Sequence, residues 1–303
     1  YDVLIESEQR MISCRVVGKL KLEKDKLTNP IAVGDLVELS MENETQGIIK
    51  NILPRKNYIA RQSPKSRLQL HLIASNIDQA ILITSMREPT LKPGFIDRFL
   101  LTTEPQNIPV VLVFNKCDLF NPDDWEEYEE LRNVYEKIGY QVCYVSANTG
   151  DGISALKEKL TDKISLFSGQ SGVGKSSVIN CIAPGIDLKT GDLSGYSGKG
   201  THTTTFAQMF AIQKGTYIID TPGIKTLTFN NLEPMDVAHN FREFFEYSES
   251  CRFGSQCTHR NEPACAVKKG LEIGEISESR YRSYLGILEE IEAQNYWERH
   301  KKY

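Results

Sequence analysis

The chain has 303 residues, a formal net charge of −4 and an isoelectric point near 5.9, which excludes a protein that binds nucleic acid through a strongly basic overall charge. Hydrophobic residues make up 40% and charged residues 25%, as in a globular protein, and no apolar run is long enough to cross a membrane. We expect a cytoplasmic protein, because seven unevenly spaced cysteines favour a reducing compartment. The first residues do not read as a signal peptide, and we also expect a monomer without membrane association.

Residues 1–70 are predicted to form an all-β domain. Short runs with strand character are separated by turn-rich stretches such as Thr28–Pro30. The predicted strands are Val3–Glu6, Met11–Val17, Asp35–Leu39, Gly47–Ile52 and Tyr58–Arg61. Five strands of this length favour an OB-type barrel, and their number also permits an SH3-like barrel.

Residues 71–230 are predicted to form an α/β domain. Ala80–Thr84 and Val110–Phe114 are largely apolar without interruption, as expected of strands that are buried on both faces of a parallel sheet. Three more strand candidates follow at Val142–Val145, Ser165–Ser168 and Thr216–Ile219. Helical stretches, for example Trp125–Ile138 and Ser154–Lys163, lie between the strands and indicate a doubly wound sheet.

A phosphate-binding loop is predicted where Gly169–Ser176 satisfies the pattern G-x-x-x-x-G-K-[ST] between a strand and a helix. Its glycines allow backbone N–H groups to surround a phosphate at a helix N-terminus. Lys175 is expected on the β- and γ-phosphates and the Ser176 hydroxyl on Mg²⁺. The predicted nucleotide contacts of this loop are Gly169, Gln170, Ser171, Gly172, Val173, Gly174, Lys175, Ser176 and Ser177.

Two loops upstream of this motif are predicted to recognise guanine. The run Asn115-Lys116-Cys117-Asp118 ends an apolar strand, and the Asp118 carboxylate can accept hydrogen bonds from guanine N1–H and its exocyclic amine. Ser146-Ala147-Asn148 ends the next strand and can offer a backbone N–H to guanine O6. Adenine would leave the carboxylate without those donors, which favours GTP over ATP.

Two downstream segments have the features of nucleotide-sensing switches. Asp220–Gly223 matches D-x-x-G, with Asp220 near Mg²⁺ and the Gly223 N–H near the γ-phosphate. In the stretch 198–205, Thr203 or Thr204 is a candidate second hydroxyl ligand of Mg²⁺, and we favour Thr204. Many GTPases orient the attacking water with a glutamine after D-x-x-G, but Ile224 stands here. Either His202 positions the water or a partner supplies the group.

The order of these motifs differs from that of conventional GTPases, because both base-reading loops precede the phosphate loop. A circular permutation explains this order, since the ends of a domain often lie close together. The second switch then leads directly into the C-terminal segment 231–303, which is predicted to be helical and to end in an amphipathic helix around Tyr281–Ile291.

The C-terminal segment also carries a predicted zinc site. Cys251, Cys257, His259 and Cys265 fall within fifteen residues, and closed Cys₃His sets bind structural Zn²⁺ tetrahedrally. His239 lies upstream and is assigned to a helix face. The alternative is a group of buried free cysteines beside an unrelated histidine.

A local basic segment runs from Lys50 to Arg67, with no acidic residue between. Such a cluster on a barrel rim can bind RNA phosphates, and it can equally be a solvated linker face.

Together these motifs resemble the ribosome small-subunit-dependent GTPase A family, also written RsgA or YjeQ. The resemblance rests on Gly169–Ser177, His202–Thr205, Asp220–Ile224 and the cysteine cluster, and covers nearly the whole chain. It implies an OB-fold, a circularly permuted GTPase domain and a zinc-binding domain. It also implies an rRNA-binding late assembly factor whose slow GTPase is stimulated by the small ribosomal subunit. Lys199 departs from the arginine common in the family, and the first cysteine spacing is one residue longer than usual.

Two other functions share the same phosphate chemistry. One is a regulatory RNA-binding module in which nucleotide hydrolysis is incidental, and the other is a GTPase that acts on a different RNA or protein. The motifs alone do not separate these alternatives from the enzyme of ribosome assembly.

Overall fold

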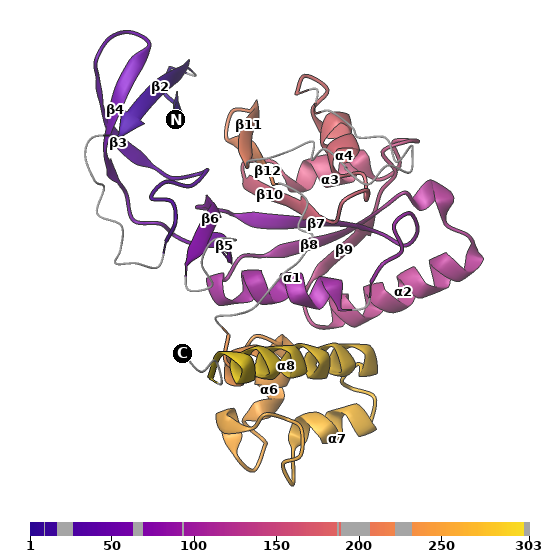
Figure 1. Ribbon diagram of the computed structural model, residues 1–303. Helices are drawn as coiled ribbons and strands as arrows, with labels where there is room; N and C mark the ends of the chain where they lie inside the picture. The colour runs from indigo at the N-terminus through magenta and orange to yellow at the C-terminus, as the bar shows by residue number, and fades with distance from the viewer. Residues whose placement is uncertain are drawn as a thin grey trace. The chain divides into compact units, whose positions relative to one another are not determined.

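The computed structural model describes residues 1–8, 10–16, 27–62, 69–92, 94–186, 188, 207–221 and 232–299 (Figure 1). The chain divides into two compact units, Tyr1–Ile77 and Asp78–Tyr303. Among its described residues, the first unit contains strands and no helix, and the second unit combines a six-stranded sheet with helices.

The first unit confirms the all-β prediction. Four strands form one sheet in the order β1-β2-β4-β3, in which only β2 and β4 pair in parallel. Ile12, Cys14 and Ile49 form its small apolar core. The antiparallel pair β5-β6 forms a second sheet, and β6 was not predicted. The strands are β1 (Asp2–Ile5), β2 (Arg10–Val16), β3 (Val37–Met41), β4 (Gln46–Ile52), β5 (Tyr58–Gln62) and β6 (Leu70–Ser75).

The sheet of the second unit has the strand order β11-β12-β10-β7-β8-β9. Its five predicted strands are parallel, and β11, which was not predicted, pairs antiparallel with β12 at one edge. All residues of β7 and β8 are buried, as their apolar sequence indicates. The strands are β7 (Gln79–Ser85), β8 (Val110–Asn115), β9 (Gln141–Tyr144), β10 (Ile164–Gly169), β11 (Gln208–Gln213) and β12 (Thr216–Asp220).

Helices cover both faces of this sheet (Figure 1). Helices α1 (Phe95–Thr103) and α2 (Pro122–Lys137) lie on one face, and α3 (Ile153–Lys159) and α4 (Lys175–Ile182) lie on the other. Asn121 is the N-cap of α2, and its side chain forms a reciprocal capping box with Asp124. Short 3₁₀ turns occur at η1 (Glu104–Gln106) and η2 (Cys117–Leu119).

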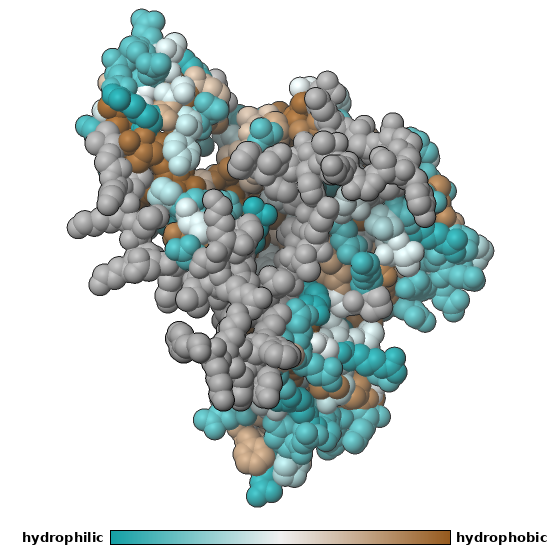
Figure 2. Space-filling view, viewed as in Figure 1, coloured by the Kyte–Doolittle hydropathy of each residue, from teal (hydrophilic) through white to brown (hydrophobic). Residues whose placement is uncertain are grey.

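Helix α2 is amphipathic, with one buried face and one exposed face. Tyr128 and Tyr135 are buried, whereas Glu126, Glu127 and Glu130 are exposed. Figure 2 shows hydrophilic side chains over the end of the unit where α2 lies. The helix therefore covers the sheet with its aromatic face and presents acidic groups to solvent.

The C-terminal part of the second unit is helical, as predicted. It contains α5 (Pro234–His239), α6 (Arg242–Ser248), the turn η3 (Gly254–Gln256), α7 (Ala266–Glu272) and α8 (Glu278–Arg299). Phe241, Phe244 and Tyr284 lie at the centre of its core, with ring centroids 4.9–5.3 Å apart. Among the described residues, no helix combines the length and the apolar character needed to span a bilayer.

A seam of ion pairs joins this helical part to α1. The Arg280 guanidinium is 2% exposed and donates to Glu243 at 2.8 Å and to Asp97 at 2.6 Å. The Tyr135 hydroxyl also donates to Asp97, at 2.7 Å. Arg242 pairs with Glu104 at 2.9 Å, and Arg98 of α1 pairs with Glu290 of α8 at 2.5 Å. The helical part is thus held on α1 and the turn after it by one buried ion pair, Arg280–Asp97, by two partly exposed pairs and by apolar packing.

Candidate functional site

The predicted nucleotide motifs follow strands that end at one edge of the sheet. The phosphate loop follows β10, the segment that begins at Asp220 follows β12, and the two base-reading loops follow β8 and β9. Since these strands are parallel and the sheet order is β12-β10-β7-β8-β9, all four loops emerge at the carboxyl edge. Open α/β sheets bind ligands at this edge.

The phosphate loop has a backbone that requires glycine. Gly172 and Gly174 both have φ of 87°, in the left-handed region that disfavours other residues. A Cβ on Gly174 would lie 2.3 Å from the Asn115 side-chain nitrogen, and one on Gly169 would lie 2.4 Å from the Ile83 carbonyl oxygen. The loop therefore forms a concave backbone turn at the N-terminus of α4, where N–H groups can receive a phosphate.

Lys175 and Asp220 form a buried ion pair beside this loop. Lys175 is 8% exposed and Asp220 is 1% exposed, and the lysine Nζ donates to Asp220 Oδ1. Ser176, the next residue of α4, is half-buried. The lysine expected on the phosphates and the carboxylate expected near Mg²⁺ are therefore brought together from segments 45 residues apart.

Asn115 connects the base-reading loops to the phosphate loop. Its side-chain Nδ2 donates to the Val173 carbonyl at 2.8 Å, and its Oδ1 accepts the Ala147 N–H at 3.2 Å. Asn115 is 1% exposed, so both hydrogen bonds are shielded from water. The three loops consequently surround one site, although they lie far apart in the sequence.

The two base-reading loops are also joined to each other. The Ser146 hydroxyl donates to Asp118 Oδ1 at 2.5 Å, and the Asn148 amide donates to Oδ2 at 3.1 Å. The hydrogen bond from Ser146 is the main cause of a lowered pKa of Asp118, which keeps the carboxylate ionised. Lys116 has φ of 67° and its Nζ donates to the Glu88 carbonyl. The side-chain contact of Asn148 was missed, because the sequence suggested only a backbone role for that loop.

Several predicted residues lie outside the described part of the chain. They are the catalytic and magnesium candidates His202, Thr203, Thr204 and Gly223, the isoleucine Ile224, and Lys199. Thr221 precedes this gap and was not predicted to contribute. Its hydroxyl donates to the Phe167 carbonyl at 2.8 Å, which attaches the start of the second switch to β10.

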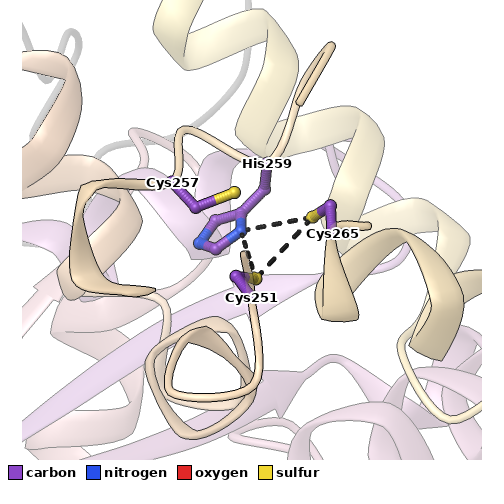
Figure 3. Close-up of side chains that lie close together, drawn as sticks. All are labelled: Cys251, Cys257, His259 and Cys265. Carbon is purple, nitrogen blue, oxygen red and sulfur yellow. Dashed lines mark hydrogen bonds between the residues drawn. The ribbon is translucent and has the colours of Figure 1, made fainter. Parts of the chain in front are cut away.

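The predicted metal ligands form one buried cluster (Figure 3). The ligand atoms of Cys251, Cys257, His259 and Cys265 all lie within 4.8 Å of one another. His259 Nδ1 lies 3.7 Å from the Cys251 sulfur and 3.5 Å from the Cys265 sulfur, and these two sulfurs are 4.0 Å apart. Four converging N and S donors can hold a metal ion.

The backbone around this cluster is rigidly held. Glu262 accepts the backbone N–H groups of Thr258 at 2.7 Å and Arg260 at 2.8 Å. The hydroxyls of Tyr281 and Tyr284, both on α8, donate at 2.7 Å to the carbonyls of His259 and Thr258. The Ala266 N–H donates to the Cys251 sulfur at 3.2 Å. Such outer contacts orient metal ligands, and sequence spacing gave no sign of them.

Burial governs the protonation of the cluster. Burial raises the pKa of the Cys257 thiol to about 12 and lowers the pKa of the His259 imidazole. Burial alone thus favours the neutral thiol, whereas a bound divalent cation would favour the thiolate, because thiolate is the form that binds metal. His239, assigned to a helix face, ends α5 and its Nε2 lies 2.8 Å from the Ser255 carbonyl oxygen.

The predicted basic segment is only partly available for a ligand. Arg55 donates to both carboxylate oxygens of Asp35, at 2.7 and 2.8 Å, and to the Pro30 carbonyl at 2.8 Å. Its charge therefore serves the fold of the first unit. Lys50, Lys56 and Arg61 are exposed, and Lys65 and Arg67 lie outside the described residues.

Comparisons with known proteins identify the family that this chain resembles. The sequence model of the RsgA GTPase family matches residues 52–230, and that of the RsgA N-terminal domain matches residues 1–49. "Small ribosomal subunit biogenesis GTPase RsgA" of Phocaeicola vulgatus is 47% identical over 97% of this chain and 94% of its own length. "Small ribosomal subunit biogenesis GTPase RsgA 2" of Bacteroides thetaiotaomicron is 46% identical, over 98% and 95%.

Solved structures give the same result. YjeQ from Thermotoga maritima has a TM-score of 0.78 and 38% identity, covering 96% of this chain and 93% of its own. YloQ, described as a circularly permuted GTPase, has a TM-score of 0.74 and 30% identity, covering 100% and 93%. The permuted order inferred from the motifs is thereby confirmed. The chain belongs to the RsgA GTPase family.

Proposed function

We propose that this GTPase acts in biogenesis of the small ribosomal subunit, where it binds rRNA and hydrolyses the β–γ phosphoanhydride of GTP. The main support for a single nucleotide site is the pair of hydrogen bonds made by the Asn115 side chain, to the phosphate loop and to the Ala147 N–H. These bonds bring all three loops within reach of one nucleotide. The assembly role is supported by the printed names of the relatives, which describe small ribosomal subunit biogenesis GTPases.

Each part of the nucleotide is assigned to its own residues. The backbone N–H groups of Gly169–Ser177 receive the phosphates, and Lys175 neutralises their charge. Asp118 accepts from guanine N1–H and the 2-amino group, and the Ala147 N–H faces O6. Lys116, next to Asn115 in the chain, is the remaining residue that we assign to the base site. Preference for guanine follows because adenine leaves a hydrogen-bonded carboxylate without its partners.

Magnesium fits the donors around the phosphate loop. The Ser176 hydroxyl, and Thr204 outside the described residues, would hold the ion, with Asp220 nearby. When bound, Mg²⁺ neutralises charge on the β- and γ-phosphate oxygens. Lys175 and Asp220 supply buried charges of opposite sign, so the site can accommodate both an anionic phosphate and a cation. Gly223 is assigned to the γ-phosphate, and His202 or a partner group to the attacking water.

The Cys₃His cluster is assigned to one structural zinc ion. Zn–S bonds of about 2.3 Å and Zn–N bonds of about 2.0–2.1 Å separate tetrahedral ligand atoms by roughly 3.5–3.8 Å. The N–S distances of 3.5 and 3.7 Å and the S–S distance of 4.0 Å are close to this range. Three thiolates and one imidazole leave no open position for substrate, so the ion would stabilise the helical part rather than catalyse a reaction.

The domain boundaries remain those inferred from the sequence. We assign residues 1–70 to the OB-type barrel, 71–230 to the GTPase domain and 231–303 to the zinc-binding domain, as the sequence suggested. The compact first unit itself extends to Ile77, because β6 pairs with β5. Because its proposed substrate is a ribosomal subunit, we assign the protein to the cytoplasm. We also assign it a monomeric state, which light scattering after size exclusion tests directly.

The decisive experiment is hydrolysis of GTP and ATP by the full chain, alone and with purified small or large ribosomal subunits. We expect slow GTP turnover that small subunits accelerate and large subunits do not. Lys175→Ala is the control that removes the phosphate contact, and it should abolish both rates. If small subunits bind in a GTP-dependent manner without changing turnover, the protein is instead a nucleotide-regulated RNA-binding module.

A further inference from the structure

The two carboxylate oxygens of Asp118 are held by different residues of one loop. Ser146 Oγ donates to Oδ1 at 2.5 Å, and Asn148 Nδ2 donates to Oδ2 at 3.1 Å. Ser146 is fully buried, whereas Asn148 and Asp118 are exposed at the site. The carboxylate therefore has one donor from the protein interior and one from the surface.

The Ser146 hydroxyl has no freedom to hold the second oxygen. Its oxygen accepts the backbone N–H groups of Asn148 at 3.2 Å and Thr149 at 3.0 Å, and its single proton is directed to Asp118 Oδ1. A hydroxyl has one donor, so nothing remains on Ser146 for Oδ2. The orientation of Oδ2 thus depends on the Asn148 amide.

The loop itself does not need the Asn148 side chain. Ser146 N donates to the Asp151 carbonyl at 2.9 Å, and Gly150 N donates to the Ser146 carbonyl at 2.9 Å. The Thr149 hydroxyl donates to Asp151 at 2.6 Å. These contacts close the turn through backbone atoms and through a neighbouring side chain. Asn148 can therefore be changed without opening the turn.

A carboxylate in this arrangement matches guanine in a specific way. It offers about four acceptor positions, and Ser146 and Asn148 occupy one on each oxygen. One position on each oxygen remains, which equals the two donors of guanine, N1–H and the 2-amino group. The terminal torsion of aspartate is soft and broad, so a donor on both oxygens is needed to fix the plane of the carboxylate. A fixed plane lowers the cost of binding the pair of donors together.

We infer that Asn148 is a positioning residue that sets guanine specificity by holding Asp118 Oδ2 in the plane that receives the second base donor. The inference rests on the proposed guanine site. Removing the amide leaves Ser146 in place and releases one end of the carboxylate. The hydrogen bond to one of the two base donors then weakens, while phosphate binding by the loop 169–177 is unaffected.

Inosine diphosphate is the appropriate probe, because inosine keeps N1–H and lacks the 2-amino group. The ratio of the dissociation constants for inosine and guanosine diphosphates measures the second hydrogen bond alone, whereas general damage to the loop changes both constants together. The full chain is titrated with each nucleotide by calorimetry, as wild type, Asn148→Ala, Asn148→Asp, Thr149→Ala and Asp118→Asn. Thr149→Ala is the matched control, since it perturbs the same turn without touching Asp118.

In Asn148→Ala we expect the ratio to fall about three- to tenfold, with inosine diphosphate affinity changed less than twofold. Asn148→Asp, which keeps the size and replaces the donor with an acceptor, should lower the ratio at least as much. Thr149→Ala should retain the wild-type ratio. If both Asn148 variants keep the ratio of Thr149→Ala, the inference is wrong. If Asp118→Asn also leaves base preference unchanged, the proposed guanine site is wrong as well, so the two failures are distinguishable.

Discussion

Replacement of Arg280 by alanine tests how the helical part is held on the sheet. The variant removes a guanidinium that is 2% exposed and leaves Asp97 and Glu243, which are 3% and 7% exposed, without their cation. Removing one partner of a buried ion pair costs about 3–5 kcal/mol, because the other charge stays desolvated. The guanidinium also lies 4.4 Å from the Phe241 ring centroid, which adds about 1 kcal/mol at such a site.

The free energy of unfolding is measured by urea titration, with hydrogen exchange of the α8 amides as the probe. A slope of about 2–3 kcal/mol per molar urea converts this loss into a midpoint lower by roughly 1.5–3 M. Arg282→Ala is the control on the same helix, since its pair with Glu278 is solvent-exposed, and it should leave the midpoint unchanged. The combined variant Arg280→Met, Asp97→Asn and Glu243→Gln should recover most of the loss, because no buried charge remains unpaired. A midpoint for Arg280→Ala equal to that of Arg282→Ala would refute the reasoning.

Three further predictions follow from the site. Asn115→Ala breaks the hydrogen bonds to Val173 and Ala147 and should weaken guanosine diphosphate binding roughly 10- to 100-fold, measured by calorimetry. Asn133→Ala, at an exposed position, is the control and should leave the affinity unchanged. Equal affinities of the two variants would contradict the bridging role of Asn115. A strong chelator should release one equivalent of zinc and reduce helical circular dichroism, with recovery on adding Zn²⁺; an unchanged spectrum after metal loss would oppose a structural ion. Burial raises the pKa of the Cys143 thiol to about 11, so about one such thiol in a thousand is ionised at pH 8. The exposed Cys181 should therefore react with a maleimide before Cys143 does. Mass spectrometry that finds Cys143 labelled first would contradict this order.

The sequence predicted those parts of the fold that local patterns determine. The buried strands β7 and β8 are continuous apolar runs. The helix predicted at Trp125–Ile138 is α2, which starts three residues earlier, at Pro122, because Asn121 caps it. Edge strand β11 was missed because it is only partly buried and its sequence, Gln-Met-Phe-Ala-Ile-Gln, is not the apolar run of a central strand. Parallel strands that end in motif loops also predicted which loops meet, since carboxyl ends share one edge.

Contacts across the unit could not be predicted in the same way. Arg280 lies 183 residues from Asp97, and nothing in either local sequence selects the other as its partner. The same limit applies to Asn148, whose amide meets a carboxylate 30 residues earlier only after β8 and β9 pair. Residue type and spacing indicate which groups carry chemistry, whereas tertiary packing decides which side chains orient them.

The permuted order changes how the proposed nucleotide site is connected to the helical part that carries the Cys₃His cluster. Helix α1 runs between β7 and β8, and β8 ends at Asn115, so α1 belongs to the base-reading half of the sheet. Arg280 and Arg242 attach the helical part to α1 and to the turn that follows it, through Asp97 and Glu104. The chain also enters the helical part directly after the segment that begins at Asp220. The helical part is therefore joined by packing to the half of the sheet that carries the proposed base-reading loops, and by the covalent chain to the half that carries the proposed phosphate-sensing segment. In a GTPase with the conventional order, the segment after D-x-x-G returns to the same sheet, so the second link exists here because the chain is permuted.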